Sequence, residues 1–376
     1  MDRPVIGVVG LGTMGLGIAQ VYAQAGHAVL ATDAHAPARA TARERLVAAL
    51  APRVAAGKLA AAEAEAIAAR LQVVDRPEGL APAALVIEAV AEDLAVKQTL
   101  FAAVEAAVAA DCVLATNTSS LSVRAIRDPL ARPMQVIGLH FFNPAPVMKL
   151  VELVVPQGAD EAGNRARALT EAAGKVVVDA PDSPGFIVNR CARPFYGEAL
   201  ALLEEGRTAA EIDAAMLAAG YRMGPFALID LIGADINLAA TRSLNAAMGG
   251  HPRYHVFAAL EQAVAAGRLG RKSGAGFVTP TAGAAAPPAD AGSIAARVEA
   301  LLVNEACWLA QESGAARDGI DTALKLGLNF PRGPFGMLAR LGGAAAVLHT
   351  LSDLRTAAPE ALKPRYDPAS YLESLA

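Results

Sequence analysis

The sequence predicts an α/β protein with a doubly wound, mostly parallel sheet in residues 1–181, followed by two all-α copies of a helical domain. Three observations lead to this prediction. Short apolar runs alternate with amphipathic stretches up to residue 181, and a glycine-rich turn follows the first of these runs. Beyond that point the strand-like runs vanish and helical periodicity replaces them.

The glycine-rich turn, Gly10 to Gly15, follows the apolar run Val5–Val9 and opens an amphipathic stretch that reaches Ala25. A second apolar run, 27–32, ends at Asp33. The order strand, Gly-x-Gly-x-x-Gly, helix, strand, acid is typical of the βαβ unit with which Rossmann-type domains bind a dinucleotide. An ordinary glycine-rich turn is the alternative, but the matching strand, helix and acid disfavour it.

Residues of this turn have separate physical tasks. Gly10 permits the tight turn, Gly12 lets the backbone approach a pyrophosphate, and Gly15 lets the helix pack close to the strand. Thr13 and Met14 lie in the first helical turn, where unpaired N–H groups and the positive end of the helix dipole attract phosphate. We therefore expect all five residues to contact the cofactor.

Asp33 predicts which dinucleotide is bound. Its carboxylate can accept hydrogen bonds from both hydroxyls of the adenosine ribose, but it would repel a 2′-phosphate. The sequence therefore favours NAD over NADP.

The remaining segments up to residue 181 continue the alternation. A helical region is expected over 38–71 with a break at 56–58, and another helix over 96–109. Further strands are expected at 72–74, 85–87, 113–116, 136–139, 150–155 and 175–178. Strands and helices that alternate in this way give a doubly wound, mostly parallel sheet.

The composition excludes several classes of protein. A chain of 376 residues is long enough for two or three domains, and its 54% hydrophobic content excludes a disordered polymer. No uninterrupted apolar run approaches the roughly 18 residues of a spanning helix, so we expect no membrane segment. The net charge is −4 without a strong basic run, which argues against a nucleic-acid partner.

The cysteines indicate a reducing compartment. Cys112, Cys191 and Cys307 are widely spaced and form no CxxC pair. This pattern predicts a reduced cytoplasmic protein, and we assign no residue to a metal.

The helical part contains an internal repeat. Three short patterns recur in the same order with nearly the same spacing: Glu198-Ala199, Ile212-Asp213 and Gly224-Pro225-Phe226 return as Glu305-Ala306, Ile320-Asp321 and Gly333-Pro334-Phe335. Chance similarity between two alanine-rich segments does not account for these matches. We therefore expect a first helical copy at 182–279, a linker at 280–292 and a second copy at 293–376.

A dinucleotide site specifies a cofactor but no reaction, and oxidation of an alcohol also needs a base. His140 follows the apolar run 136–139, which places it at the end of a strand, where doubly wound sheets bind ligands. Glu152 interrupts the apolar run 150–155, where a carboxylate is costly unless it is paired. We expect a histidine on a neighbouring strand to pair with Glu152, which would fix the imidazole tautomer. An edge strand with Glu152 facing water is the alternative.

Ser119 lies at the end of another expected strand, where its hydroxyl could bind a substrate oxygen. A role as a helix cap or turn residue is the alternative.

Four motifs resemble signatures of the 3-hydroxyacyl-CoA dehydrogenase family: residues 10–19, Asn117 to Ser122, Gly138 to Glu152, and Pro184 to Arg190. The resemblance runs from Val5 to Pro368. It implies oxidation of (S)-3-hydroxyacyl-CoA to 3-ketoacyl-CoA with NAD, in acyl-CoA catabolism such as fatty acid β-oxidation.

The resemblance also implies roles for individual residues. His140 would be the general base, paired with Glu152, while Ser119 and Asn189 would hold the oxygen atoms of the substrate. Cofactor contacts would come from Glu92, Lys97 and Asn117, and Lys58 would help to bind CoA. The expected small-molecule partner is thus an acyl-CoA, and the protein is expected to be a monomer or a homodimer.

The chain departs from the commonest pattern of the family in carrying two helical copies. Asn189 lies nine residues before Glu198, whereas Ala296 lies nine residues before Glu305. Because Arg190 is matched by Arg297, the register holds while the amide is missing, and we expect the second copy to be structural. Two alternatives to the implied function are an NAD-dependent dehydrogenase of a free hydroxy acid or sugar acid, and a catalytically silent NAD-binding scaffold.

Overall fold

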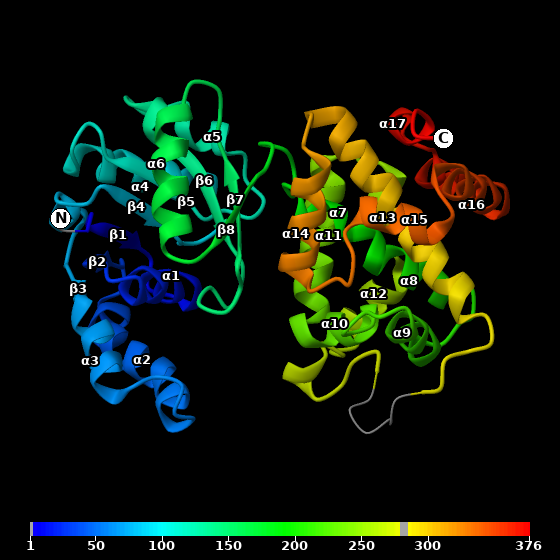
Figure 1. Ribbon diagram of the computed structural model, residues 1–376, viewed down its shortest axis with the longest axis horizontal. Coiled ribbons are helices and arrows are strands. Elements are labelled where there is room, and N and C mark those ends of the chain that lie inside the picture. The colour runs from blue at the N-terminus through cyan, green and yellow to red at the C-terminus, as the bar shows by residue number, and fades with distance from the viewer. Residues whose placement is uncertain (1–2, 279–284) are drawn as a thin grey trace. The chain divides into compact units, whose positions relative to one another are not determined.

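The computed structural model describes residues 3–278 and 285–376, and the chain divides into two compact units, Met1–Ser183 and Pro184–Ala376 (Figure 1). Within the described residues, the first unit holds an eight-stranded sheet and the second is built of helices. None of the described helices combines the length and the apolar character needed to cross a membrane.

The sheet of the first unit has the order β3-β2-β1-β4-β5-β6-β7-β8. Neighbouring strands run parallel except β6 and β7, which are antiparallel. The strands are β1 (Ile6–Val9), β2 (Val29–Thr32), β3 (Leu71–Val73), β4 (Leu85–Glu88), β5 (Val113–Thr116), β6 (Val136–Phe141), β7 (Leu150–Val154) and β8 (Val176–Asp179). The predicted α/β class with a doubly wound, mostly parallel sheet is therefore confirmed.

Helices cover both faces of this sheet, and two apolar cores result, since successive strand residues point to opposite faces. Ile6 and Val8 lie in one apolar core, whereas Val9 lies in the other. The first core includes residues of α1 (Thr13–Gln24), α2 (Ala36–Ala55), α3 (Ala61–Arg70) and α6 (Asp160–Ala172). The second includes residues of α4 (Leu94–Ala107) and α5 (Val123–Arg127).

The second unit spans both segments in which helical copies are expected. Its first helices are α7 (Val188–Cys191), α8 (Arg193–Glu204), α9 (Ala209–Ala218), α10 (Pro225–Ile232), α11 (Ala234–Ala247) and α12 (Ala258–Ala265). They are followed by α13 (Ala291–Ser313), α14 (Arg317–Leu328), α15 (Pro334–Leu341), α16 (Ala344–Ala357) and α17 (Ser370–Glu373). Of the expected linker, 280–284 lie outside the described residues, and 291–292 already belong to α13.

Buried ion pairs join the two copies in a reciprocal way. Arg190 Nε lies 2.7 Å from Glu305 Oε1, and Arg297 Nε lies 2.7 Å from Glu198 Oε1. Arg190 and Arg297 are equivalent positions of the repeat, and so are the two glutamates. Each copy thus supplies the guanidinium for one pair and the carboxylate for the other.

Two further contacts recur in both halves of the unit: an aspartate caps a helix, and each of the two paired glutamates accepts a hydrogen bond from a tyrosine. Asp213 accepts hydrogen bonds from the first-turn N–H groups of α10, and Asp321 does so for α15. The hydroxyl of Tyr254 donates a hydrogen bond to Glu305, and that of Tyr366 donates one to Glu198.

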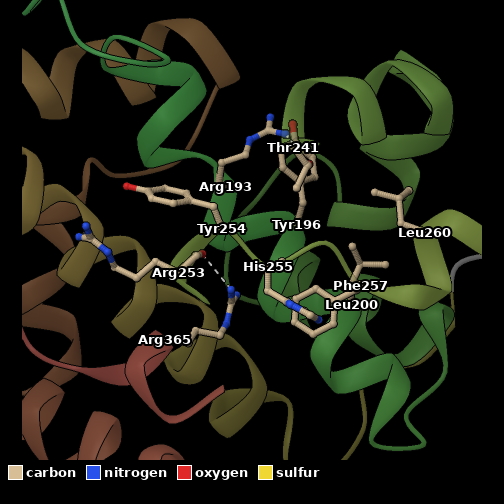
Figure 2. A pocket seen from close by; sticks show the side chains of 11 residues that line it. Arg193, Tyr196, Leu200, Thr241, Arg253, Tyr254, His255, Phe257, Leu260 and Arg365 are labelled. Atoms are coloured by element: carbon tan, nitrogen blue, oxygen red, sulfur yellow. Dashed lines mark hydrogen bonds between the residues drawn. The ribbon is translucent and has the colours of Figure 1, made fainter. Parts of the chain in front are cut away.

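This unit also contains a small pocket whose lining includes Arg193 (Figure 2).

Candidate active site

The carboxyl ends of β1, β4, β5 and β6 lie next to one another at one edge of the sheet. In parallel sheets this edge is where ligands bind. Several of the predicted site residues of the first unit, including the glycine turn, Asn117 and Ser119, lie in the segments that follow these strand ends.

The glycine turn has the close contacts that its sequence predicts. Gly10 has φ +97°, and a Cβ on it would collide with the carbonyl of Ala89. A Cβ on Gly15 would collide with the carbonyl oxygen of Gly10. Both positions therefore require glycine, whereas a Cβ on Gly12 would meet no heavy atom within 4 Å. The open space above Gly12 is where a pyrophosphate could approach the backbone.

The neighbouring groups also fit a dinucleotide. Gly12 is the N-cap of α1, no side chain caps that helix, and its first turn, including Thr13 and Met14, holds no acidic residue. The backbone N–H groups there suit an anion. Asp33 is half-buried, and its two oxygens accept hydrogen bonds from the N–H groups of Leu11 and His35, each at 2.7 Å. These bonds orient the carboxylate at the end of β2, where the ribose would lie.

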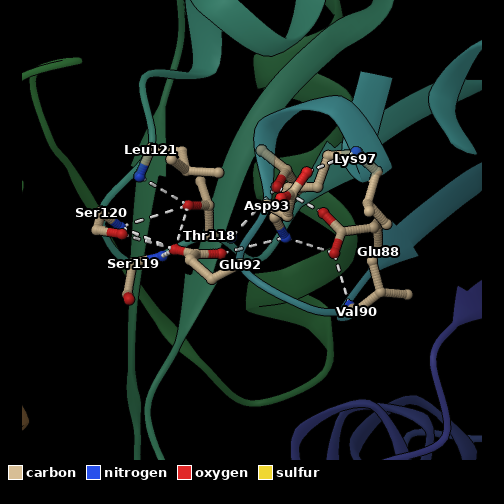
Figure 3. A network of polar contacts seen from close by, with 11 residues as sticks. Glu88, Val90, Glu92, Asp93, Lys97, Thr118, Ser119, Ser120 and Leu121 are labelled. Atoms are coloured by element: carbon tan, nitrogen blue, oxygen red, sulfur yellow. Dashed lines mark hydrogen bonds and ion pairs between the residues drawn. The ribbon is translucent and has the colours of Figure 1, made fainter. Parts of the chain in front are cut away.

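A buried charged network follows β4 (Figure 3). Lys97 is 1% exposed, and its Nζ lies 2.6 Å from Glu88 Oε1 and 3.3 Å from Glu92 Oε2. The hydroxyl of Thr116 donates to Glu88 Oε2 at 2.7 Å. Sequence reasoning missed Glu88, although a carboxylate that ends an apolar strand is the same signal that singled out Glu152.

Glu92, which follows β4, forms hydrogen bonds with residues that follow β5. Its Oε1 accepts hydrogen bonds from the hydroxyl of Thr118 at 2.6 Å and from the N–H of Ser119 at 3.0 Å. Burial alone would raise the pKa of Glu92, but the Thr118 bond, the Lys97 charge and the donors of Ser119 and Ser120 outweigh it and lower the pKa. Glu92 is therefore a fixed negative charge beside Ser119.

Asn117 joins the ends of β5 and β6, since its Oδ1 accepts a hydrogen bond from the N–H of Phe141 at 2.8 Å. This bond holds the strand end next to His140.

His140 and Glu152 face each other on β6 and β7. They are directly paired in the antiparallel register, and His140 Nδ1 lies 2.7 Å from Glu152 Oε2. His140 is 6% exposed and Glu152 is fully buried. The expectation that His140 follows its strand is wrong, because β6 continues to Phe141. An edge position for Glu152 is also excluded, because β7 lies between β6 and β8.

The remaining predicted residues lie elsewhere. Lys58 is exposed in the turn between α2 and α3. Asn189 lies on α7 of the second unit, where its carbonyl oxygen accepts a hydrogen bond from Arg193 Nε at 3.0 Å.

The sheet topology, the glycine turn and the acid after β2 define an NAD-binding domain of the Rossmann type. Comparison with known proteins then gives the family. Residues 5–183 match the 3-hydroxyacyl-CoA dehydrogenase NAD-binding domain, and residues 185–280 and 292–376 each match the C-terminal domain of the same enzymes. The chain belongs to the 3-hydroxyacyl-CoA dehydrogenase family, and it is an NAD-dependent oxidoreductase that acts on a CH–OH group.

Individual relatives differ in how much of the chain they match. The 3-hydroxyadipyl-CoA dehydrogenase of Escherichia coli (strain K12) is 36% identical over 99% of this chain and 97% of its own length. A probable 3-hydroxybutyryl-CoA dehydrogenase of Bacillus subtilis is 38% identical over 74% of this chain and 97% of its own length. The crystal structure of 3-hydroxybutyryl-CoA dehydrogenase from Escherichia coli K12 superposes with a TM-score of 0.90 at 34% identity, covering 100% of this chain and 98% of that one.

Proposed function

We propose that the protein oxidises (S)-3-hydroxyacyl-CoA to 3-ketoacyl-CoA with NAD and that His140 is its general base. The observation that carries this proposal is the buried His140–Glu152 pair, 2.7 Å apart, in a chain of this family. A base beside the carboxyl ends of the strands lies on the same edge of the sheet as the glycine turn.

The pair suits removal of a hydroxyl proton. With Nδ1–H donating to Glu152, the imidazole is held in the tautomer whose Nε2 carries the lone pair. Nε2 takes the proton of the 3-hydroxyl, and NAD held at the glycine turn would supply the acceptor for the hydride that leaves the same carbon. The alcohol thereby loses one proton and one hydride, and the Glu152 carboxylate stabilises the imidazolium that results.

Other residues would position the two reactants. We assign Ser119 and Asn189 to the oxygen atoms of the substrate, and the exposed ammonium of Lys58 to the anionic CoA moiety. Gly10, Gly12, Thr13, Met14, Gly15 and Asp33 would hold NAD, together with Glu92, Lys97 and Asn117. The names of relatives include both 3-hydroxybutyryl-CoA and 3-hydroxyadipyl-CoA dehydrogenases, and the proposal covers either class of acyl group.

Steady-state rates of NADH oxidation test this function in the reverse direction. We expect rapid oxidation with acetoacetyl-CoA and at least about 100-fold lower kcat/KM with free acetoacetate, since the free acid lacks the CoA contacts. Equal kcat/KM for the two would favour a dehydrogenase of free hydroxy acids. NADH binding without turnover on any 3-ketoacyl-CoA would indicate a silent scaffold.

A further inference from the structure

Arg193 is a buried cation at the start of α8. Its side chain is 9% exposed, and its hydrogen bonds go to neutral groups: Nε donates to Asn189 O at 3.0 Å and Nη1 donates to Thr241 Oγ1 at 3.1 Å. The guanidinium lies 4.9 Å from the centre of the Tyr196 ring. Burial lowers the pKa of Arg193. Among the described residues, no carboxylate forms an ion pair with it.

Other buried arginines of the same unit have carboxylate partners. Arg190 and Arg253 pair with Glu305, and Arg365 pairs with Glu198. Burying an unpaired charge is costly, so a position that lacks a counter-ion calls for a functional explanation.

A comparison of the two copies shows which residues of the first copy recur in the second and which do not. Arg190 recurs as Arg297 and Glu198 recurs as Glu305, and these residues form the reciprocal pairs between the copies. The position of Arg193 is instead occupied by Ala300 in the second copy, just as Asn189 is replaced by Ala296. Like Asn189, which we assign to a substrate oxygen, Arg193 is therefore present in the first copy and replaced by alanine in the second.

The surroundings of Arg193 favour an anion. It lines the small pocket together with Tyr196 and Thr241, and Figure 2 shows its guanidinium ending beside Thr241. Besides two tyrosines, the charged or titratable residues of the lining are Arg193, Arg253, His255 and Arg365, and the lining contains no carboxylate. Arg253 and Arg365 are already neutralised by glutamates, so Arg193 is the cation that still needs a partner.

We propose that Arg193 binds the terminal carboxylate of a dicarboxylic 3-hydroxyacyl-CoA and so selects this class of substrate. The proposal rests on the function proposed above. Arg193 lies four residues after Asn189 and donates a hydrogen bond to its carbonyl, which places a cation beside the residue assigned to a substrate oxygen. In a six-carbon diacid, three C–C bonds of about 1.5 Å separate the 3-carbon from the carboxylate carbon, a reach of roughly 4 Å. A guanidinium is the side chain best suited to hold a carboxylate with paired hydrogen bonds.

Two esters of equal length test this selectivity. 3-Oxoadipyl-CoA and 3-oxohexanoyl-CoA share the CoA moiety and a six-carbon chain. The last carbon is a carboxylate in the first ester and a methyl group in the second. We expect the wild-type protein to prefer the diacid ester by at least about 10-fold in kcat/KM, because a charged group that loses its partner is costly. Arg193→Met should lower kcat/KM for the diacid ester by about 10- to 100-fold and change that for the hexanoyl ester by less than about threefold. Arg193→Lys should retain part of the preference.

The controls separate selectivity from structure. Arg242→Met removes an exposed arginine next to Thr241 and should leave the ratio of the two kcat/KM values unchanged. Equal losses with both esters in Arg193→Met would show that Arg193 merely positions Asn189 or contacts CoA, and would overturn the proposal. If the variants do not fold, competitive inhibition of the wild type by adipyl-CoA and hexanoyl-CoA decides, since equal inhibition constants would also overturn it.

The test also distinguishes failure of this inference from failure of the proposed function. A wild-type protein that reduces both esters equally well lacks the Arg193 selectivity but keeps the function. A protein that reduces neither ester contradicts the function itself.

Discussion

Glu152 lies within β7 and Asp33 directly after β2, and the surroundings of these two carboxylates suit them to different tasks. Glu152 is fully buried and lies against the imidazole of His140, so its charge acts on that imidazole with little screening by water. Asp33 is half-buried at the end of β2, and the N–H groups of Leu11 and His35 fix its orientation while leaving it accessible to a ligand. We assign the first to catalysis and the second to the choice of cofactor.

Asp33 predicts a clear preference for NADH over NADPH, because its charge would repel the 2′-phosphate. In the double variant Asp33→Ser, Ala34→Arg we expect the ratio of kcat/KM for NADH to that for NADPH to fall by at least about 10-fold, since a repulsive charge is replaced by an attractive one. Steady-state kinetics with both cofactors measure this ratio. Equal kcat/KM values for the two cofactors in the unmodified protein would contradict the role of Asp33.

At the scale of elements, strand bounds that depend on an apolar run could be predicted, and so could the His140–Glu152 pair, because a carboxylate in an apolar strand is itself a signal. Strand bounds that depend on a contact with another element could not be predicted. The bounds of β5, Val113–Thr116, follow from its apolar run alone. The end of β6 was missed because His140 is polar and stays in the strand through its pairing with Glu152, which lies twelve residues away. Glu88 carries the same signal as Glu152, but its partners Lys97 and Thr116 come from other elements, and no local pattern in the sequence identifies them.

The segment between β6 and β7 is held by another such partnership. Lys175 lies just before β8, and its Nζ donates hydrogen bonds to the carbonyl oxygens of Ala145 at 2.5 Å and Met148 at 2.8 Å. Burial lowers the pKa of Lys175 to about 8, from an ordinary value of 10.5. The ammonium thus holds the segment between β6 and β7, which follows His140, against the start of β8.

This lowered pKa predicts how stability depends on pH. Between pH 8 and 10.5 the unfolded chain binds a proton that the folded protein has released, so the free energy of unfolding should rise with pH across this window. We expect a contribution on the order of 1–3 kcal/mol that is absent in Lys175→Met, measured by urea unfolding at several pH values. Lys149→Met, which removes an exposed lysine nearby, should keep the wild-type slope. The same pH dependence in Lys175→Met and wild type would refute this contribution.

At the scale of the whole molecule, the reciprocal pairs make the helical unit resemble a two-fold interface built within one chain. In an isologous interface the same residues meet from both sides, as Arg190–Glu305 and Arg297–Glu198 do here. Relatives such as the Bacillus subtilis protein match only 74% of this chain over nearly their whole length. We propose that the second copy covers a face of the first and takes no part in the reaction.

Truncation after residue 278 tests this proposal. Removing α13 and the helices beyond it would leave Arg190 and Glu198 without partners and uncover apolar residues of α8 and α9, against which α13 packs. We expect the shortened protein to aggregate or to form a dimer, because a large apolar patch becomes exposed. Light scattering coupled to gel filtration gives the mass, with the full chain as the control. A soluble, fully active monomer would show that the second copy has another purpose.

The central claim is that His140 removes the proton of the substrate hydroxyl. The most direct measurement is kcat for NADH-dependent reduction of acetoacetyl-CoA by His140→Gln, compared with the wild-type protein and accompanied by the Kd for NADH. We expect kcat to fall by about 10²- to 10⁴-fold, the usual contribution of a positioned general acid or base, while the Kd changes by less than about twofold. A kcat near the wild-type value in a folded His140→Gln protein would contradict the account.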